Sequence, residues 1–429
     1  MLKPEDNDRV TLVGKGKPAG ELFRRYWQPA LLSEELPDPD CPPVRVKLLG
    51  EDLIAFRDSN GDVGLLDAYC PHRRAPMFYG RNEDCGLRCV YHGWKFDRHG
   101  DCTDMPSEPS GTPLQAKVKI AAYPVFEKAG IVWTYMGPKA SMPEPPDYEW
   151  MRAPGTHRHV SKTFEDCNWL QAMEGGLDTA HSSFVHNDFI GNKNSLRNQD
   201  RAPRLEIETT PYGYYYVSTR SLLDGTSYVR MYQFMMPNQQ MRSSTVNFVA
   251  GLGKDDPHAT PKMDGHLWVP IDDERTYVYN WTCAHSPNVQ FSNDYVERWE
   301  SFMGRGKDDL IPGTYRLKRN SSNDYMIDRE LQKHKTYSGI KGINTQDYAL
   351  QEGMGPIVDR SKEFLGTSDR AIVTTRRMLL DGARQVERGE RPPGADPSTH
   401  RNARPYDRVL QAGESWREIF PAEAVAKWL

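Results

Sequence analysis

Residues 70–94 read CPHRRAPMFYGRNEDCGLRCVYHGW and contain two cysteine–histidine pairs, Cys70-x-His72 and Cys89-x2-His92, with sixteen residues between them. Each pair fits within one tight loop, and two such loops can face each other across a metal centre. The order of the four residues does not match a zinc finger, in which both cysteines come first and the histidines follow on a helix. Scattered core residues are the simpler alternative, but a chance match at this spacing is uncommon.

The residue types at these positions favour an iron–sulfur cluster. Two thiolates hold one iron of a [2Fe–2S] cluster and two neutral imidazoles hold the other, which raises the reduction potential. We therefore predict that Cys70, His72, Cys89 and His92 bind such a cluster. The other five cysteines are expected to be structural: Cys41, Cys85, Cys102, Cys167 and Cys283.

The composition limits the class of protein. The chain has 429 residues, and its 55 basic and 59 acidic residues give a formal charge of −4. A nucleic-acid-binding protein would usually show a basic face or tail, so this balance argues against that class. The sequence has no apolar run near the roughly 18 residues that span a bilayer, and its charged start lacks the apolar centre of a signal peptide. We expect a cytoplasmic protein of two or three domains.

Short strand patterns surround the two cysteine–histidine pairs, and residues 20–30 have the pattern of a short helix. The Asn60-Gly61 pair predicts a tight type I′ hairpin, because both residues accept positive φ angles. Three prolines in residues 142–146 predict a linker. The sequence therefore predicts a first domain over residues 1–150, which is all-β apart from an N-terminal helical segment.

A second domain is predicted over residues 151–429, beginning with a helix near 165–186. Longer strand patterns follow at 213–223, 226–236, 243–251, 265–271 and 275–283. Turn residues between them predict an antiparallel meander. Residues 284–335 are polar and irregular and form a candidate lid, whereas residues 368–390 have helical spacing. The expected buried face of that helix contains Ile372, Met378, Leu379 and Ala383. The predicted fold class is α+β, a small all-β domain followed by a larger domain with an antiparallel sheet covered by helices.

A second group of metal-binding residue types lies in residues 168–186, NWLQAMEGGLDTAHSSFVH. On a helix, Asp178 and His181 would lie about 60° apart, so the carboxylate could fix the orientation of a metal-bound imidazole. His181 and His186 would lie about 140° apart, so they converge on one metal only if the helix bends or ends between them. Two histidines and one carboxylate would leave half of an octahedron open for O2 and a substrate. A pair of ordinary buried histidines is the alternative.

Both segments resemble one family. The pattern CPH…CVYHGW resembles the Rieske motif of ring-hydroxylating oxygenases, with Arg74 where the family commonly has glycine. Residues 168–186 resemble the family's signature Asn-Trp…Glu…Asp-x2-His-x4-His. The matching residues are Asn168, Trp169, Glu174, Asp178, His181 and His186. Many dihydroxylating members have asparagine where this chain has Gly175, so the resemblance is to the phthalate dioxygenase type.

The resemblance implies a mononuclear Fe(II) held by His181, His186 and one carboxylate from far along the chain. Asp347 matches the family's late carboxylate. Three other acidic residues in the same region stay open as alternatives: Glu352, Asp359 and Glu363.

The family's assembly also has consequences for this chain. In the family, the cluster of one subunit lies near the iron of the next, in a homotrimer or a dimer of trimers. The resemblance therefore implies that Asp178 is a catalytic residue that bridges His92 of one chain to His181 of its neighbour. Electrons are expected from a separate flavin- and ferredoxin-type NADH reductase, because the chain has no glycine-rich dinucleotide-binding fingerprint. A Rieske electron carrier without oxygenase activity is the different-class alternative, but such carriers usually have an extra cysteine beside each ligand pair and a membrane anchor.

The phthalate-type resemblance implies an aromatic carboxylate substrate, with cis-dihydroxylation as the reaction in aromatic catabolism. Oxidative O-demethylation or ether cleavage of a methoxylated or phenoxy acid is the alternative, since the same iron site serves both. A buried carboxylate needs a guanidinium or several donors to offset its desolvation. Arg204, Arg230 and Arg242 lie in or beside predicted strands and are the candidates, although each could instead face outward from its strand.

Overall fold

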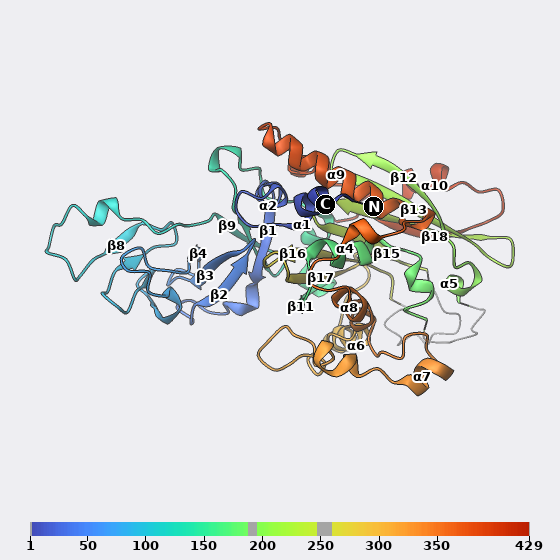
Figure 1. Ribbon diagram of the computed structural model, residues 1–429, viewed down its shortest axis with the longest axis horizontal. Helices are drawn as coiled ribbons and strands as arrows, with labels where there is room; N and C mark the ends of the chain where they lie inside the picture. Colours follow the sequence, from blue (N-terminus) through green and yellow to red (C-terminus); the bar gives the residue numbers. More distant parts are fainter. Residues whose placement is uncertain (1, 188–194, 247–259, 429) are drawn as a thin grey trace. The chain divides into compact units, whose positions relative to one another are not determined.

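The structure is a computed structural model that describes residues 2–187, 195–246 and 260–428 (Figure 1). The chain forms two compact units, one over Val13–Pro145 and one over Met1–Leu12 together with Pro146–Leu429. Helix α1 (Pro4–Thr11) packs against helices of the larger unit, and the side chain of Asn7 donates a hydrogen bond to the carbonyl oxygen of Val358 (3.1 Å). Residues 1–12 therefore lie outside the first unit, although the predicted boundary included them.

The smaller unit is fully described by the structure and contains three antiparallel sheets, with strand orders β1-β10-β9, β2-β3-β4 and β5-β6-β7-β8. Its elements are α2 (Pro18–Phe23), β1 (Trp27–Leu32), β2 (Val44–Leu48), β3 (Glu51–Arg57), β4 (Val63–Asp67), β5 (Arg81–Glu83), β6 (Gly86–Arg88), β7 (Lys95–Phe96), β8 (Cys102–Asp104), β9 (Val125–Lys128) and β10 (Ile131–Tyr135). The helix predicted over 20–30 is shorter, because the residues from Trp27 onward pair with β10 as a strand, and those after Trp27 are buried.

The hairpin between β3 and β4 has the predicted position but a different turn. Gly61 has a φ of +88°, whereas Asn60 does not have a positive φ. The main-chain N–H of Asp58 donates to the carbonyl oxygen of Asp62 (2.8 Å), and the Asp58 carboxylate accepts from the N–H groups of Asn60 and Asp62. The loop is therefore longer than a type I′ turn and needs only one left-handed residue, which the glycine supplies.

One antiparallel sheet dominates the larger unit. Its strand order is β11-β17-β16-β15-β14-β13-β12, and β18 pairs with β14. The strands are β11 (Arg158–Glu165), β12 (Arg204–Thr210), β13 (Gly213–Ser221), β14 (Ser227–Met235), β15 (Gln239–Ser244), β16 (Lys262–Pro270), β17 (Thr276–Ala284) and β18 (Tyr406–Leu410). Strands β12 to β17 follow one another as neighbours, which confirms the predicted meander. Most of the strand predicted at 243–251 lies outside the described residues.

Helices of the larger unit pack against this sheet and against one another, with α4 on β16 and α9 on β12 (Figure 1). They are α3 (Glu149–Arg152), α4 (Trp169–Leu177), α5 (Leu196–Gln199), α6 (Asn293–Met303), α7 (Arg329–His334), α8 (Ile343–Gly353), α9 (Arg370–Glu387) and α10 (Trp416–Glu423). The predicted irregular lid over 284–335 instead contains α6 and α7, because α6 buries Tyr295 and Trp299 on one face. In α9, three of the four residues expected to be buried are buried, and Met378 is half-buried.

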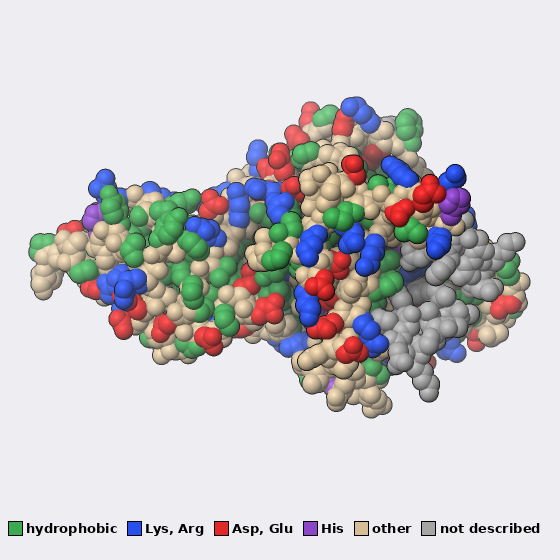
Figure 2. Space-filling model, turned by 90° about the horizontal axis from the view of Figure 1, so that it is seen from below, with side chains coloured by type: hydrophobic (Ala, Val, Ile, Leu, Met, Phe, Trp, Pro, Cys, Tyr) green, Lys and Arg blue, Asp and Glu red, His purple; other side chains and the backbone are tan. Residues whose placement is uncertain are grey.

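Basic and acidic side chains are intermixed on the face that Figure 2 shows, in keeping with the formal charge of −4. Among the described residues, no helix is both long and apolar enough to cross a membrane.

Candidate metal centres and active site

The two cysteine–histidine pairs lie in loops of the same local geometry. In the first loop, the main-chain N–H of Arg74 donates to the carbonyl oxygen of Cys70 (2.9 Å), and in the second, that of Gly93 donates to the carbonyl oxygen of Cys89 (2.9 Å). Arg74 and Gly93 both have positive φ angles, +57° and +78°. Glycine adopts this conformation without steric cost, whereas arginine is strained there, so glycine would suit position 74 better. The Arg74 guanidinium lies at the surface and pairs with Asp67 (3.2 Å).

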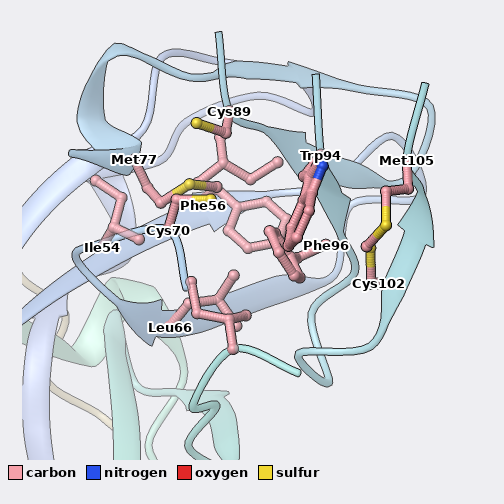
Figure 3. Close-up of a cluster of buried hydrophobic side chains, with 12 residues drawn as sticks. Ile54, Phe56, Leu66, Cys70, Met77, Cys89, Trp94, Phe96, Cys102 and Met105 are labelled. Atoms are coloured by element: carbon pink, nitrogen blue, oxygen red, sulfur yellow. The ribbon is translucent and has the colours of Figure 1, made fainter. Parts of the chain in front are cut away.

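The side chains of these loops meet in the smaller unit. Cys70 and Cys89 belong to a buried hydrophobic cluster (Figure 3), and the hydrogen bond between their thiols lowers the pKa of Cys89 to about 6 and raises that of Cys70. The imidazole centroids of His72 and His92 are 4.4 Å apart, and Trp94 stacks on His72. The buried Nδ1 atom of His72 has no hydrogen-bond partner in the described structure. Two facing thiols and two facing imidazoles, one with an unsatisfied nitrogen, fit a [2Fe–2S] cluster.

The helix that carries the second group of residues ends earlier than predicted. Helix α4 ends at Leu177, Asp178 has extended backbone angles, and the Asp178 carboxylate caps the turn that follows. His181 then begins the 3-10 helix η6 (His181–Ser183). The prediction that Asp178 and His181 share one helical face is therefore wrong. Because α4 has ended before His181, residues 181–186 form a 3-10 helix and a turn rather than a regular α-helix, and the two imidazoles converge.

Three ligand atoms meet beside this break. Nε2 of His181 lies 3.1 Å from Nε2 of His186, and Oδ1 of Asp347, on α8, lies 3.5 and 3.3 Å from these two nitrogens. Nδ1 of His186 donates to Oε1 of Gln346 (2.7 Å), which leaves the Nε2 lone pair for the triad. Oδ2 of Asp178 lies 3.6 Å from Nδ1 of His181 and favours the same arrangement in that ring. Two imidazole nitrogens and one carboxylate oxygen at these separations fit a divalent iron site.

The other acidic residues considered as the third ligand lie elsewhere. Glu352 accepts a hydrogen bond from the main-chain N–H of Asp166 (3.0 Å), Asp359 caps a 3-10 turn, and Glu363 pairs with a buried arginine. Asp347 is the carboxylate that the fold brings to the two histidines. Burial alone would raise the pKa of Asp347, but His186, His181 and Arg242 together outweigh burial and hold the pKa below its ordinary value.

One face of the sheet forms a wall of the cavity beside the triad. The wall residues alternate along neighbouring strands: Arg230 and Tyr232 on β14, Arg242 and Ser244 on β15, and Asp264, His266 and Trp268 on β16. The strand register places Arg242 between Tyr232 and Asp264. Helices and their connections add further lining residues, including Gly175, Gly176, Arg197, Trp299, Asn344 and Gln351. Apart from Arg230 and Arg242, these residues were not predicted, although polar residues alternating along successive strands are a usable signal for such a wall.

The three predicted substrate arginines have different positions. Arg230 is buried in the cavity wall and donates to Oγ of Ser244 (2.9 Å). Arg242 lines the same wall and pairs with Asp264. Arg204, in contrast, lies on the edge strand β12 with 74% of its side chain exposed and does not line the cavity. The structure therefore corrects the prediction for Arg204, because this edge position faces solvent.

His266 is held in one neutral form. Burial and the nearby positive charge of Arg242 lower its pKa to about 3. The side-chain nitrogen of Asn280 donates to the carbonyl oxygen of Val278 (3.2 Å), so the amide oxygen of Asn280 faces Nδ1 of His266 (2.8 Å). Nδ1 therefore carries the proton, and Nε2 is a hydrogen-bond acceptor.

Two family descriptions together, and several known proteins each, match most of this chain. The chain matches the Rieske [2Fe-2S] domain over residues 26–124 and the family described as LigXa C-terminal domain like over residues 134–428. It is 41% identical to the phthalate 4,5-dioxygenase oxygenase subunit of Pseudomonas putida, over 91% of this chain and 88% of that protein. It is 37% identical to the 3-chlorobenzoate-3,4-dioxygenase oxygenase subunit of Comamonas testosteroni, over 92% of each. It is 33% identical to the 5,5'-dehydrodivanillate O-demethylase oxygenase subunit of a Sphingobium species, over 91% of this chain and 83% of that protein.

A solved structure shares the fold. Dicamba monooxygenase bound to dicamba has a TM-score of 0.58 at 19% sequence identity, covering 86% of this chain and 99% of that chain. The matches to whole oxygenase subunits show that this chain is an oxidoreductase that uses O2 and receives electrons from a partner protein. Its cofactors are a Rieske [2Fe–2S] cluster and a mononuclear iron. The chain belongs to the Rieske non-haem iron oxygenases, as an oxygenase component of the phthalate dioxygenase type.

Proposed function

We propose that this oxygenase component acts on a phthalate-like aromatic carboxylate by cis-dihydroxylation, in the catabolism of aromatic compounds. The observation that most supports the proposal is that one cavity is lined both by the His181–His186–Asp347 triad and by arginines of the sheet. A carboxylate held by those arginines would place its ring in the same cavity as the metal ligands.

The proposal assigns two sets of ligands. The Rieske cluster is held by Cys70, His72, Cys89 and His92. The mononuclear iron is held by His181, His186 and Asp347. When bound, these centres supply single electrons and the activation of O2 beside the substrate. The side chains of Gln346 and Asp178 orient the two imidazoles, and three protein ligands leave positions free for O2 and substrate.

The charge of the cavity supports an anionic substrate. Asp264 pairs with Arg242, and the buried Arg230 and the half-buried Arg197 are further cations in the lining. Burial and the positive charge of Arg230 lower the pKa of Arg197 to about 10. A carboxylate would relieve this repulsion, because guanidinium groups bind carboxylates through two parallel hydrogen bonds. We therefore propose Arg230 and Arg242, with Arg197, as the residues that bind the substrate carboxylate.

A product analysis tests the proposed reaction. The purified enzyme, a generic reductase, NADH and O2 are incubated with phthalate, benzoates and methoxybenzoates, and the products are identified. We expect a cis-diol from a phthalate-like acid. If no aromatic acid is oxidised while methyl esters or uncharged rings are, the assignment of the arginines is contradicted.

Oxidative O-demethylation is the second candidate, because an O-demethylase oxygenase subunit is 33% identical over 91% of this chain. It uses the same residues with a methoxylated or phenoxy acid. Formaldehyde release from the methoxybenzoates, without a cis-diol from any acid, would favour this reaction.

The proposal also includes an assembly and a location. The electron donor is a flavin- and ferredoxin-type NADH reductase, and the oxygenase is a homotrimer or a dimer of trimers. The location is the cytoplasm, which is supported by the finding that none of the seven cysteines, all of them among the described residues, forms a disulfide.

Within the trimer, Asp178 is proposed to bridge His92 of one subunit to His181 of the next. We expect Asp178→Asn to keep both metal centres but to lose about 100-fold in coupled turnover, because an amide does not hold two imidazoles as a carboxylate does. The measurement is product formation together with the rate at which a chemically reduced cluster is reoxidised by O2 in the presence of substrate. Asp200→Asn, at a carboxylate that instead accepts from the main-chain N–H of Ser221, is the control. Near-normal product formation by Asp178→Asn would refute the bridge.

A further inference from the structure

Two adjacent glycines of α4, Gly175 and Gly176, have no side chains, and the side chains of two cavity-lining residues occupy the space beside them. A Cβ atom at position 175 would lie 1.8 Å from Nε2 of Gln351, and one at position 176 would lie 2.4 Å from the ring of Trp268. Both Gln351 and Trp268 line the cavity. The missing side chains on this face of α4 therefore allow Gln351 and Trp268 to shape the cavity.

Gln351 lies on the same face of α8 as the metal ligand Asp347, because residues four apart on a helix are neighbours on its surface. Gln351 as a whole is 6% exposed, and its main-chain carbonyl oxygen accepts a hydrogen bond from the side chain of Gln171 (3.0 Å). The backbone at Gln351 is thus held in place beside α4.

The carboxamide of Gln351 forms no hydrogen bond with the residues that the structure describes (2–187, 195–246 and 260–428). Neither polar atom of this side chain is among the fully buried side-chain atoms without a partner, so the carboxamide is accessible from the cavity that Gln351 lines. A ligand in this cavity can therefore supply its hydrogen-bond partner. The side chain is therefore placed to meet a polar group of the substrate.

We propose that Gln351 is a specificity-determining residue, whose Nε2–H donates a hydrogen bond to an oxygen substituent on the aromatic ring of the substrate. Hydroxyl, methoxy and carboxylate oxygens all accept such a bond, whereas a methyl group of similar size does not. The inference rests on the proposed function, because it assumes an aromatic acid in this cavity. It adds that the enzyme distinguishes acids by a second, oxygen-bearing substituent.

Binding to the metal-loaded, full-length enzyme under anaerobic conditions tests this inference without requiring turnover. Titration calorimetry compares hydroxybenzoates with methylbenzoates matched in ring position. We expect the wild type to bind the hydroxy acid about tenfold more tightly at one ring position at least. Gln351→Leu, which keeps a similar volume but removes the donor, should lose this preference and keep its affinity for the methyl acid.

Three further variants separate this role from a structural one. Leu350→Ala, on the exposed side of the same helix, is the matched control and should keep the preference. Gly175→Ala should lose the preference in the same way as Gln351→Leu, because its Cβ displaces the carboxamide. Gly175→Ala combined with Gln351→Ala should lose no more than either change alone, and circular dichroism and iron content show that each variant is folded and loaded.

Two results would overturn the inference while leaving the proposed function intact. One is a hydroxyl-over-methyl preference that survives in Gln351→Leu, and the other is a wild type that binds aromatic acids with no such preference at any ring position. A wild type that binds no aromatic acid would contradict the proposed function and this inference together.

Discussion

Asp347→Ala is expected to leave about two irons per chain where the wild type holds about three, because the Rieske cluster contributes two irons and the mononuclear site one. The spectrum of the cluster should be unchanged, since its ligands lie in the smaller unit, Val13–Pro145. Loss of a residue that only supports a metal ligand usually costs 10–100-fold in metal affinity or activity, so the loss of a direct ligand should cost turnover at least about 100-fold. Iron quantitation and product formation measure the two effects.

Glu352→Gln is the matched control for this prediction. Glu352 lies on the same helix as Asp347 but accepts hydrogen bonds from the main-chain N–H of Asp166 and from Tyr325. The control should keep about three irons. A full iron complement in Asp347→Ala, or iron loss in Glu352→Gln instead, would show that Asp347 is not the third ligand.

Glu174→Gln is expected to lower the free energy of unfolding by about 3–5 kcal/mol, because it removes the carboxylate that the buried guanidinium groups of Arg360 and Arg376 share. Glu174 is buried on α4 and accepts from Arg360 (2.9 Å) and from Arg376 (2.5 Å). Arg360 also donates to Asn7 of α1 (3.0 Å), and Arg376 also pairs with Glu363 (2.6 Å). One carboxylate therefore ties α4 to α1, α9 and the segment around Arg360. Denaturation in urea, followed by tryptophan fluorescence, measures the loss.

The pH dependence of this stability follows from the same contacts. Burial alone would raise the pKa of Glu174, but Arg360 and Arg376 outweigh it and hold the pKa below its ordinary value of 4.5. Because the folded-state pKa is the lower one, the contribution to stability is complete above pH 4.5 and is lost as the pH falls through the folded-state pKa. The wild type should therefore lose more stability than Glu174→Gln on acidification.

Glu387→Gln provides the comparison for Glu174→Gln. Glu387 pairs with Arg9 (2.6 Å), but both side chains are substantially exposed, so this change should cost at most about 1 kcal/mol. Equal losses in the two variants would show that the buried network contributes no more than a surface pair.

Local spacing in the sequence predicted much of this protein. Each cysteine–histidine pair spans one loop, so the four proposed cluster ligands could be predicted from their short spacing alone. Alternating strands with turn residues predicted the meander, because side-chain direction along a strand repeats every two residues. Asp347 was found through the family resemblance, since nothing in the local sequence around it distinguishes it from Glu352.

Other features depended on contacts between segments far apart in the chain. The end of α4 at Leu177 decides how His181 and His186 converge, and a helical pattern that continues through residue 186 does not reveal it. Arg204 and Arg230 both lie in or beside predicted strands. Arg230 is buried and Arg204 is exposed, because β14 has neighbouring strands on both sides whereas β12 is an edge strand.

The sequence by itself determined the class of chemistry, because the two cysteine–histidine pairs and the His181–His186 pair are metal-binding residue types at fixed short spacings. The tertiary structure alone decided which side chains share a cavity with them. The side chain of Gln351 has room beside the cavity because Gly175, which is distant in sequence but adjacent in space on α4, has no side chain. Such a relation arises from the packing of α4 against α8, and no local pattern in either helix contains it.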